Sequence, residues 1–470
     1  MPFLSRLQHW AAIAPARLAV VIGDSSISYA ELVTQAQTLL PAESLLTTVQ
    51  QRNSVQAVFK IVAGVAGHGR ISVLDPSWPP TVTESVQQHL SDVLDQFPAE
   101  DLATELIDGP ANSDFLIGLT SGTSSTPKGF SRDRGSWQRS FEPGIEVFGL
   151  REAEHVLVPG QLAMSLNLYT LAECLYAGAT FHSIEEFDVA KVFEVLDQYP
   201  VQRLVLVPTI LGMLARRAAS TGRQDAVQTV ICAGSKLEPA AVQAAQNWLP
   251  EAKIFEYYGA SELGFVASRC LDGAADPEST IVGQAFPCVE LAIRDEADAE
   301  LPAWVPGTIH VRSALVSNGY LWGGDGEGFE KTWQWCTVGD QGYLSDAGVL
   351  HFLGRRSDML VSSGHNVYPH EIEHALLNLP GIEAAVVAGI PDGIRGKRIV
   401  AGVLPANRFA ESALTSRALR QAVADVLAEY KLPGLYFQLT EMPVGSSGKI
   451  NRGLFEQWIA AGDARVRRIS

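Results

Sequence analysis

Short apolar strands alternate with a helix in the middle of this chain, and this rhythm constrains the fold more than any other feature. Segments 203–210 (RLVLVPTI), 229–234 (TVICAG) and 253–259 (KIFEYYG) predict strands, and 238–249 (EPAAVQAAQNWL) predicts a helix. Strand, helix and strand in this order predict a parallel sheet with helices on its faces. Ligands of such sheets bind beyond the carboxyl ends of the strands, where AGSK and YYGASE lie.

The pattern changes after about residue 350, where a smaller unit is predicted. Segments 383–390 (EAAVVAGI) and 398–404 (RIVAGVL) predict paired strands. Segment 411–430 predicts one long amphipathic helix. Together these elements indicate an α+β unit of about a hundred residues.

Length and composition agree with more than one globular domain. The chain has 470 residues, 47% of them hydrophobic and 19% charged, which excludes disorder and coiled coil as the main state. A charged turn at 353–359 (LGRRSDM) separates two apolar segments and marks a boundary. We expect an α/β protein in which a large N-terminal domain (1–354) of mixed and parallel sheets flanked by helices precedes a small α+β C-terminal domain (355–470).

The charge balance and the cysteines restrict partners and location. A formal net charge of −17 opposes general nucleic-acid binding, although a local loop can still attract a small anion. No apolar run approaches the ~20 residues of a membrane span, and the N-terminal segment predicts an amphipathic helix. The five cysteines lack metal or disulfide spacing, so we expect a reducing, cytoplasmic setting. The sequence leaves the oligomeric state open.

The strongest chemical motif is LTSGTSSTPKG at residues 119–129. Its glycines let backbone N–H groups converge, its hydroxyls add donors and Lys128 adds a positive charge, as in loops that close over phosphate oxygens. It is not a Walker A loop, because Pro127 and Gly129 flank the lysine where that motif has Gly and Ser/Thr. Taken alone, such a segment is a flexible surface turn about as often as it is a phosphate-binding loop.

Six further segments follow this loop in a fixed order. With them, the chain resembles the adenylate-forming superfamily of acyl-CoA synthetases, firefly luciferases and nonribosomal adenylation domains. The resemblance covers nearly the whole chain, from about residue 15 to residue 452. The six segments are 233–235 (AGS), 257–262 (YYGASE), 338–340 (VGD), 354–358 (GRRSD), 363–373 (SGHNVYPHEIE) and 443–449 (PVGSSGK).

The resemblance implies an acid–thiol ligase that joins a carboxylic acid to the α-phosphate of ATP, releases pyrophosphate and passes the acyl group to a thiol. Two anions meet in the first step, so the site has to supply positive charge and hydrogen-bond donors. Lys449 would reach the α-phosphate and the attacking carboxylate, Ser261 would bind the α-phosphate and Glu262 would ligate Mg²⁺. The departing pyrophosphate would be held by Thr120, Ser121, Gly122, Thr123 and Lys128.

The nucleoside would be bound by the motifs that follow the central strands. By the same resemblance, Asp340 would accept hydrogen bonds from both ribose hydroxyls, with Arg355 nearby. Tyr258 would stack on adenine, beside the turn residues Gly234, Ser235 and Gly259.

The small domain would act as a mobile lid that carries Lys449. Ser357 and Asp358 would form its hinge, although Ser357 stands where the family has an Asp. Rotation about this hinge would withdraw Lys449 and bring Gly364 to a thiol tunnel. CoA is the expected thiol, and the alternative is the phosphopantetheine arm of a carrier protein, loaded by a freestanding adenylation enzyme.

The acyl pocket is expected near Met164 and Ser165. Met164 is flexible and apolar, so it can line an acyl pocket but cannot hydrogen-bond a carboxylate strongly. Glu173 is the only acid between residues 158 and 174, which disfavours an α-amino acid. We expect an apolar acyl or aryl acid, as in fatty acid metabolism, without being able to name it. Ser125, which replaces the second glycine of the phosphate loop, restricts that loop.

Residues 370–374 (HEIEH) support a rival interpretation, because H-E-x-x-H on a helix is the signature of a zinc hydrolase. Pro369 predicts a helix start just before it, so His370 would lie in the first, fraying turn. The same residues fit the Pro-x-Glu-Ile-Glu element of the adenylate-forming superfamily. The zinc hydrolase is therefore the minor alternative.

Overall fold

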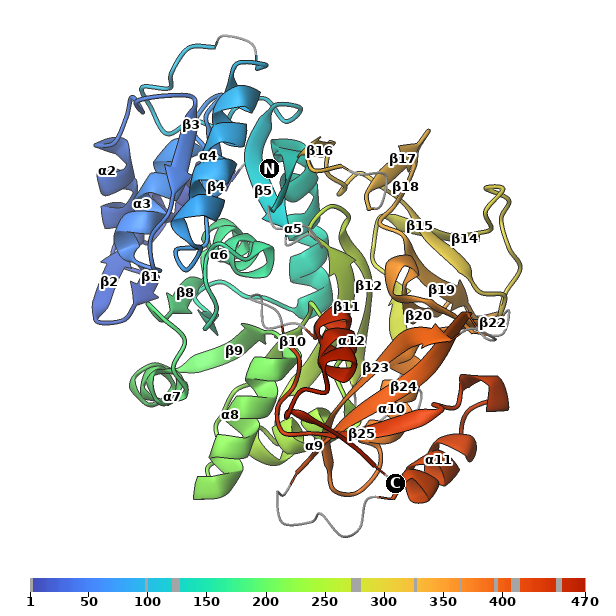
Figure 1. Ribbon diagram of the computed structural model, residues 1–470. Helices are drawn as coiled ribbons and strands as arrows, with labels where there is room; N and C mark the ends of the chain where they lie inside the picture. The colour runs from blue at the N-terminus through green and yellow to red at the C-terminus, as the bar shows by residue number, and fades with distance from the viewer. Residues whose placement is uncertain are drawn as a thin grey trace.

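The computed structural model describes residues 3–97, 100–120, 127–271, 280–324, 328–362, 365–392, 396–406, 415–444 and 450–469. These residues form three sheets with helices packed against them (Figure 1). Two of the sheets belong to the larger N-terminal part, and the third belongs to a smaller C-terminal α+β part. This architecture confirms the fold class expected from the sequence.

The largest sheet begins as a parallel sheet, as the strand–helix–strand rhythm predicts. β9 (Val201–Leu206), β10 (Thr229–Cys232) and β11 (Lys253–Ala260) are parallel neighbours. The expected helix is α9 (Pro239–Trp248), and Pro208 ends the strand expected over 203–210 because it opens α8 (Pro208–Thr221). The sheet continues through β7 (His155–Leu157), β8 (Thr180–Ser183) and β1 (Leu18–Ile22) to the edge strand β2 (Ser25–Ser28).

Beyond β11 the same sheet becomes antiparallel, so it is a mixed sheet, as the expected fold class allows. β12 (Gly264–Leu271) runs antiparallel to β11. On its other side, the sheet is extended by strands that follow β12 in the sequence. Those strands are β13 (Ile281–Ala285), β14 (Val289–Arg294), β15 (Gly307–Ser313), β17 (Glu330–Thr332), β18 (Trp335–Thr337), β19 (Asp340–Leu344) and β20 (Leu350–Arg355).

The second sheet carries the two ends of the predicted phosphate loop. Its strands lie in the order β16 (Gly319–Trp322), β6 (Lys128–Asp133), β5 (Asp114–Thr120), β4 (Arg70–Val73) and β3 (Leu46–Val49). β6 is antiparallel to both neighbours, so a strand from residues 319–322 lies directly beside the end of the loop.

Helices join these two sheets through one hydrophobic core. Val58 of α3, Phe141 of α5 and Leu171 of α6 are buried in a cluster that also contains Leu116 of β5 and Val156 of β7.

No helix among the described residues is long and apolar enough to cross a membrane. The remaining helices of this part are α1 (Phe3–Ile13), α2 (Tyr29–Gln37), α3 (Val55–Gly64), α4 (Pro80–Leu94), α5 (Arg134–Phe148), α6 (Ser165–Ala177) and α7 (Val189–Gln198).

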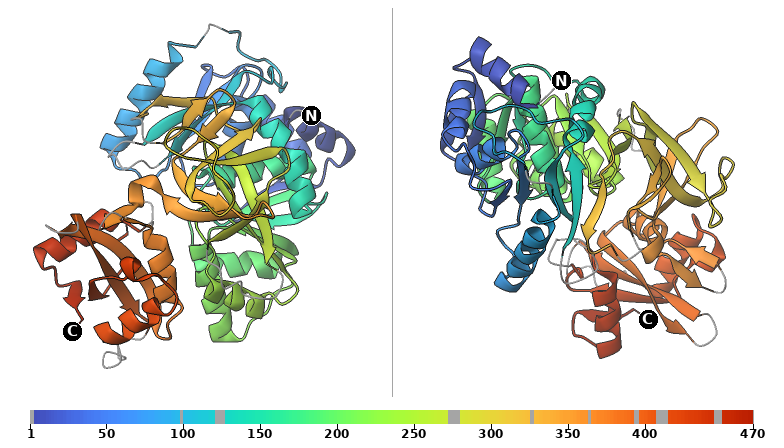
Figure 2. Two further views of the ribbon diagram at one scale, coloured as in Figure 1. Left: turned by 90° about the vertical axis from the view of Figure 1, so that its right-hand side faces the viewer. Right: turned by 90° about the horizontal axis from the view of Figure 1, so that it is seen from above.

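The C-terminal segment forms its own lobe beside the larger body (Figure 2). The expected strand pair is β23 (Ile382–Asp392) and β24 (Gly396–Pro405), which run antiparallel. The boundary between residues 354 and 355 stays a prediction, supported by the change of sheet between β20 and the next strand. The other elements of this lobe are β21 (Leu360–Ser362), β22 (His365–Val367), β25 (Leu435–Leu439), β26 (Val466–Arg468), α10 (Pro369–Leu377) and α12 (Arg452–Ala461).

The long helix expected over 411–430 is wrong in its extent. Within the described residues the helix is α11 (Ser416–Ala424), and Glu429–Lys431 forms a separate 3₁₀ turn. The turn lets Leu427 and Leu432 pack on the core of the lobe and brings Lys431 to Glu371 of α10. These distant contacts outweigh the local helical period.

The buried His182, which contacts the half-buried His155, makes the stability of the parallel sheet depend on pH. His155 Nδ1 and His182 Nε2 lie 2.8 Å apart, and burial, with His155 as a second cause, lowers the pKa of His182 to about 3. Unfolded histidine has a pKa near 6.5, so below that pH the unfolded state binds a proton that the folded state does not. Stability contributed by neutral His182 is therefore lost as the pH falls from about 6.5.

We expect the protonation equilibrium of His182 to lower the free energy of unfolding by about 2 kcal/mol between pH 7 and pH 5. His182→Phe should remove this contribution from the slope of the unfolding free energy against pH. Urea titrations across this pH range measure both slopes, so a lower absolute stability of the variant does not matter. His9→Gln, at an exposed site on α1, is the matched control and should keep the wild-type slope. Equal slopes for wild type and His182→Phe would contradict the prediction.

Candidate active site

The predicted phosphate loop starts and ends on the second sheet. Thr120 is the last residue of β5 and lies opposite Lys128, the first residue of β6. Lys128 is 7% exposed, and its Nζ lies 5.5 Å from the ring centroid of Tyr320 on β16. The loop residues Ser121, Gly122, Thr123 and Ser125 lie outside the described residues.

A carboxylate reaches the same place from the turn after β11. Glu262 is 7% exposed, and its Oε1 accepts a hydrogen bond of 2.7 Å from Tyr320 Oη. Burial, followed by the negative charge of Glu262, raises the pKa of Tyr320, so the phenol keeps the proton that it donates. Tyr320 therefore stands between the predicted phosphate lysine and the predicted magnesium ligand.

The predicted α-phosphate serine contacts the predicted acyl pocket. Ser261 Oγ donates a hydrogen bond of 2.9 Å to Ser165 Oγ, and Ser165 is the first residue of α6. Met164 is the N-cap of that helix and is 48% exposed. The structure thus brings Ser261 and Ser165 together and leaves the Met164 side chain partly in solvent.

The predicted ribose carboxylate is buried and not fully satisfied. Tyr258 Oη donates a hydrogen bond of 2.5 Å to Asp340 Oδ2, and Arg355 Nε lies 3.7 Å from Oδ1. Within the described part of the chain, Oδ1 is buried without a hydrogen-bond partner. Burial raises the pKa of Asp340 to about 6, while Tyr258 and Arg355 oppose that shift. An unsatisfied buried acceptor of this kind suits a ligand hydroxyl.

The predicted adenine turn lies at the same edge of the sheet as Tyr258. β10 and β11 are parallel with Cys232 opposite Glu256, so Gly234 and Tyr258 each lie two residues beyond that pair. Gly234 has a φ of +89°, which favours glycine, and Ser235 beside it is exposed. Tyr258 and Gly259 lie at the end of β11, within the strand predicted over 253–259.

The hinge and lid residues are described only in part. Asp358 closes the 3₁₀ turn Arg356–Asp358, which also contains Ser357, between β20 and β21. Gly364 and Lys449 lie outside the described residues. Their predicted roles remain predictions.

The HEIEH segment forms the first turns of α10 and holds the lobe together instead of forming a zinc site. His374 Nδ1 lies 2.8 Å from Glu238 Oε2 of the larger part, and Glu371 accepts two hydrogen bonds from Lys431 Nζ. Burial lowers the pKa of His370 to about 4. Among the described residues, no group of three or more His, Cys, Asp or Glu could hold a metal ion. Nothing therefore supports the zinc hydrolase.

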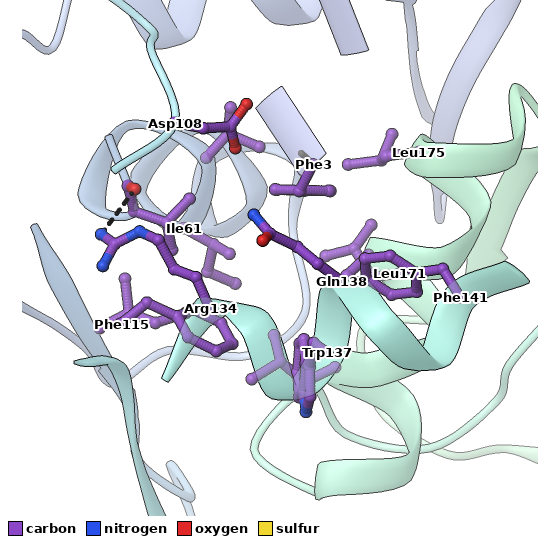
Figure 3. Close-up of a pocket in the computed structure, with 15 residues that line it drawn as sticks. Phe3, Ile61, Asp108, Phe115, Arg134, Trp137, Gln138, Phe141, Leu171 and Leu175 are labelled. Atoms are coloured by element: carbon purple, nitrogen blue, oxygen red, sulfur yellow. Dashed lines mark hydrogen bonds between the residues drawn. The ribbon is translucent and has the colours of Figure 1, made fainter. Parts of the chain in front are cut away.

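A mostly apolar cavity lies between α1, α3, α5 and α6 (Figure 3). Leu168, one turn from Ser165, lines it together with Leu171 and Trp137. The guanidinium of Arg134 at its edge donates to the carbonyl oxygens of four residues, Val65, Gly69, Ser113 and Asp114. The cavity thus offers apolar surface, and none of the predicted nucleotide-binding residues line it.

Two residues that organise this site were not predicted from the sequence. Tyr320 contacts both Lys128 and Glu262, and Arg132 donates two hydrogen bonds to the carbonyl oxygen of Ser261. Tyr320 lies in a short strand far from the loop in sequence, and nothing local marks it. Its place four residues after the loop lysine Lys128 was the only sign of Arg132 in the sequence.

Comparison with known proteins gives matches over most of the chain. The AMP-binding enzyme family matches residues 49–321, and the AMP-binding enzyme C-terminal domain matches residues 371–449. The uncharacterized acyl–CoA ligase YhfT of Bacillus subtilis (strain 168) is 33% identical over 346 residues, which are 73% of this chain and 68% of YhfT.

Two solved structures share the fold. ATP-bound MatB from Rhodopseudomonas palustris has a TM-score of 0.83 at 21% identity, with 98% of this chain and 100% of that chain covered. The o-succinylbenzoate-CoA synthetase MenE from Bacillus subtilis, in complex with ATP and magnesium ion, has a TM-score of 0.81 at 20% identity. That comparison covers 96% of this chain and 99% of MenE.

Replacing Glu371 tests whether the HEIEH segment is structural. Glu371→Gln removes the charge of one partner of a mostly buried ion pair but keeps an acceptor for Lys431, so we expect a loss of about 1–2 kcal/mol of stability and no change in bound metal. Thermal denaturation and elemental analysis of the purified protein measure these two quantities. Stoichiometric zinc that is lost in His374→Ala would contradict the structural role.

Proposed function

The chain belongs to the AMP-binding enzyme family and acts as an AMP-forming acid–thiol ligase, and we propose that it uses ATP with Mg²⁺ and passes the acyl group to CoA. Acid activation as acyl-AMP is followed by thioester formation. One observation carries the proposal: the buried cation Lys128 and the buried carboxylate Glu262 both contact the phenol of Tyr320.

The phosphate end of the site would combine Lys128 with a magnesium ion. Mg²⁺ is commonly bound through one or two carboxylates together with substrate phosphates, and Glu262 is a buried hard-oxygen donor with one oxygen held by Tyr320. Bound there, the ion would supply positive charge to the phosphate oxygens. Thr120 and Lys128 would hold the departing pyrophosphate, with Ser121, Gly122 and Thr123 completing the loop by resemblance to the family.

The nucleoside end would use the unsatisfied oxygen of Asp340. Its Oδ2 is engaged by Tyr258, whereas the buried Oδ1 has capacity for the ribose hydroxyls. Adenine would lie against Tyr258, the turn at Gly234 and Ser235, and the backbone at Gly259. Arg355, beside Asp340, would keep that carboxylate ionised in the complex.

The lid is proposed to alternate between two positions. In one, Lys449 would neutralise charge at the α-phosphate while the acid attacks. In the other, rotation at Ser357 and Asp358 would replace Lys449 by the Gly364 segment and open a path for the thiol. The domain division at 354/355 is part of this proposal.

The acid is proposed to carry an apolar acyl or aryl group, as acids of fatty acid metabolism do. Its carboxylate would lie near Ser165, at the start of α6, with Met164 beside it. The apolar cavity that begins one turn further along α6 supports this choice of acid. A carrier-protein phosphopantetheine is the alternative acceptor to CoA.

A cytoplasmic setting is proposed from the cysteines. The structure shows no disulfide among the described residues, and Cys270 and Cys288 are exposed. Exposed thiols suit a reducing compartment.

Pyrophosphate release against a panel of fatty, aryl and amino acids, with and without CoA, tests the function. We expect release only with ATP, Mg²⁺ and an apolar acid, and thioester only when CoA is added. Thioester formation on an acyl carrier protein but not on CoA would favour the alternative acceptor. No release with any acid would contradict the proposal.

Glu262→Gln should abolish most acyl-AMP formation. It keeps the size of the side chain and its acceptor for Tyr320 but removes the charge that would bind Mg²⁺, so we expect a ~10²–10³-fold loss of rate. Pyrophosphate release at varied Mg²⁺ measures the effect. Glu371→Gln, outside the proposed site, is the control and should keep nearly full activity. Equal losses in both variants would contradict the role of Glu262.

Lys449→Ala should separate the two half-reactions. Only the first concentrates negative charge at the α-phosphate, so acyl-AMP formation should fall ~10²–10³-fold while thioester formation from preformed acyl-AMP stays mostly intact. Single-turnover assays of each half-reaction measure the two rates. Equal loss in both would contradict the alternation of the lid.

A further inference from the structure

Arg132 is a deeply buried cation next to the proposed active site. It lies on β6, four residues after Lys128, and is 3% exposed. Burial lowers the pKa of Arg132 to about 10, so it still carries its charge at neutral pH. It forms no ion pair with any of the residues that the structure describes, and a buried charge is costly unless neighbouring groups compensate it.

Backbone oxygens provide that compensation. Arg132 Nε and Nη2 both donate to the carbonyl oxygen of Ser261, at 3.1 and 2.9 Å. Its Nη1 donates to the carbonyl oxygen of Leu315 at 2.6 Å and to Ser136 Oγ at 3.1 Å. One guanidinium therefore binds two segments that are more than fifty residues apart in sequence.

Each of these segments leads to a group of the proposed active site. The carbonyl of Ser261 belongs to the peptide that joins it to Glu262, so fixing this oxygen fixes the start of the Glu262 backbone. Leu315 precedes β16, which carries Tyr320, and Ser317 N donates to the carbonyl oxygen of Glu262 at 2.7 Å. Arg132 itself is on the strand that starts at Lys128.

We propose that Arg132 is a positioning residue that sets the spacing between Glu262, Tyr320 and Lys128, and thereby the place of the metal ion beside the phosphates. The inference rests on the proposed function. Two donors of the planar guanidinium bind one carbonyl oxygen while a third reaches another segment, and a lysine ammonium cannot reproduce this fork. Displacement of a catalytic group by about 1 Å can cost ~10²-fold in rate.

Arg134 provides a matched control on the neighbouring element. It is 4% exposed, and burial lowers its pKa to about 10 as well. Its guanidinium also binds carbonyl oxygens, but those of Val65, Gly69, Ser113 and Asp114, which belong to neither the proposed nucleotide site nor the proposed metal site, although Arg134 and Val65 line the apolar cavity. Loss of either arginine should destabilise the fold, whereas only loss of Arg132 should disturb the metal.

The test compares R132M, R132K and R134M in the full-length enzyme, with rates normalised to the folded fraction. We expect R132M to lose ~10²-fold in the rate of pyrophosphate release and to need several-fold more Mg²⁺ for half-maximal rate. R132K should lie between R132M and wild type in both the rate and the Mg²⁺ requirement. If R132M does not fold, R132K alone tests the positioning role. R134M should lower the melting temperature while its Mg²⁺ requirement stays within twofold of wild type.

Calorimetry of ATP binding, once with Mg²⁺ and once with EDTA, distinguishes failure of the proposed function from failure of the positioning role. Wild type that neither binds Mg²⁺·ATP nor releases pyrophosphate would overturn the proposed function and this inference with it. An active wild type with the same Mg²⁺ requirement in the Arg132 variants and in R134M would overturn the positioning role alone.

Discussion

The second sheet is joined to the turn after β11 by the hydrogen bonds of one buried guanidinium, and the rest of the site depends on that junction. β6 lies between β5 and β16, and Arg132 on β6 donates twice to the carbonyl oxygen of Ser261. Buried hydrogen-bonding groups are costly to leave unpaired, so this contact holds its geometry. The phosphate-loop strand, the Glu262 turn and the Tyr320 strand therefore keep a fixed spacing.

This junction also explains how an acidic chain can bind a polyanion. The net charge is −17, yet Lys128 and Arg132, an even number of residues apart on β6, point to the same face of that strand. Both are buried, where water screens their charge less than at the surface. Glu262 lies in the same region and offsets part of this positive charge, which leaves a net positive charge for phosphates. The distant surface charge contributes little at this range.

Contiguous patterns were readable from the sequence, and contacts between distant segments were not. The strands at 229–234 and 253–259 and the helix at 238–249 follow from local period, and seven ordered motifs carried the family resemblance. Tyr320 and Arg132 matter only through partners 58 and 129 residues away, which no local pattern specifies. The shortened α11 has the same cause, because Lys431 bonds to Glu371, 60 residues distant. The phosphate-binding role of the loop at 121–126 rests on the family resemblance.

The HEIEH segment shows how one pattern can serve a different chemistry. His374, which a zinc hydrolase would use as a ligand, instead reaches Glu238, in the loop that follows the Gly234–Ser235 turn. α10 of the small lobe is thereby connected to the loop proposed to hold adenine. A single partly buried hydrogen bond to a carboxylate contributes only about 1.5–3 kcal/mol net. A contact of that strength can hold the lobe against the nucleotide loop and still be exchanged, which is what the proposed rotation of the lobe between two half-reactions requires.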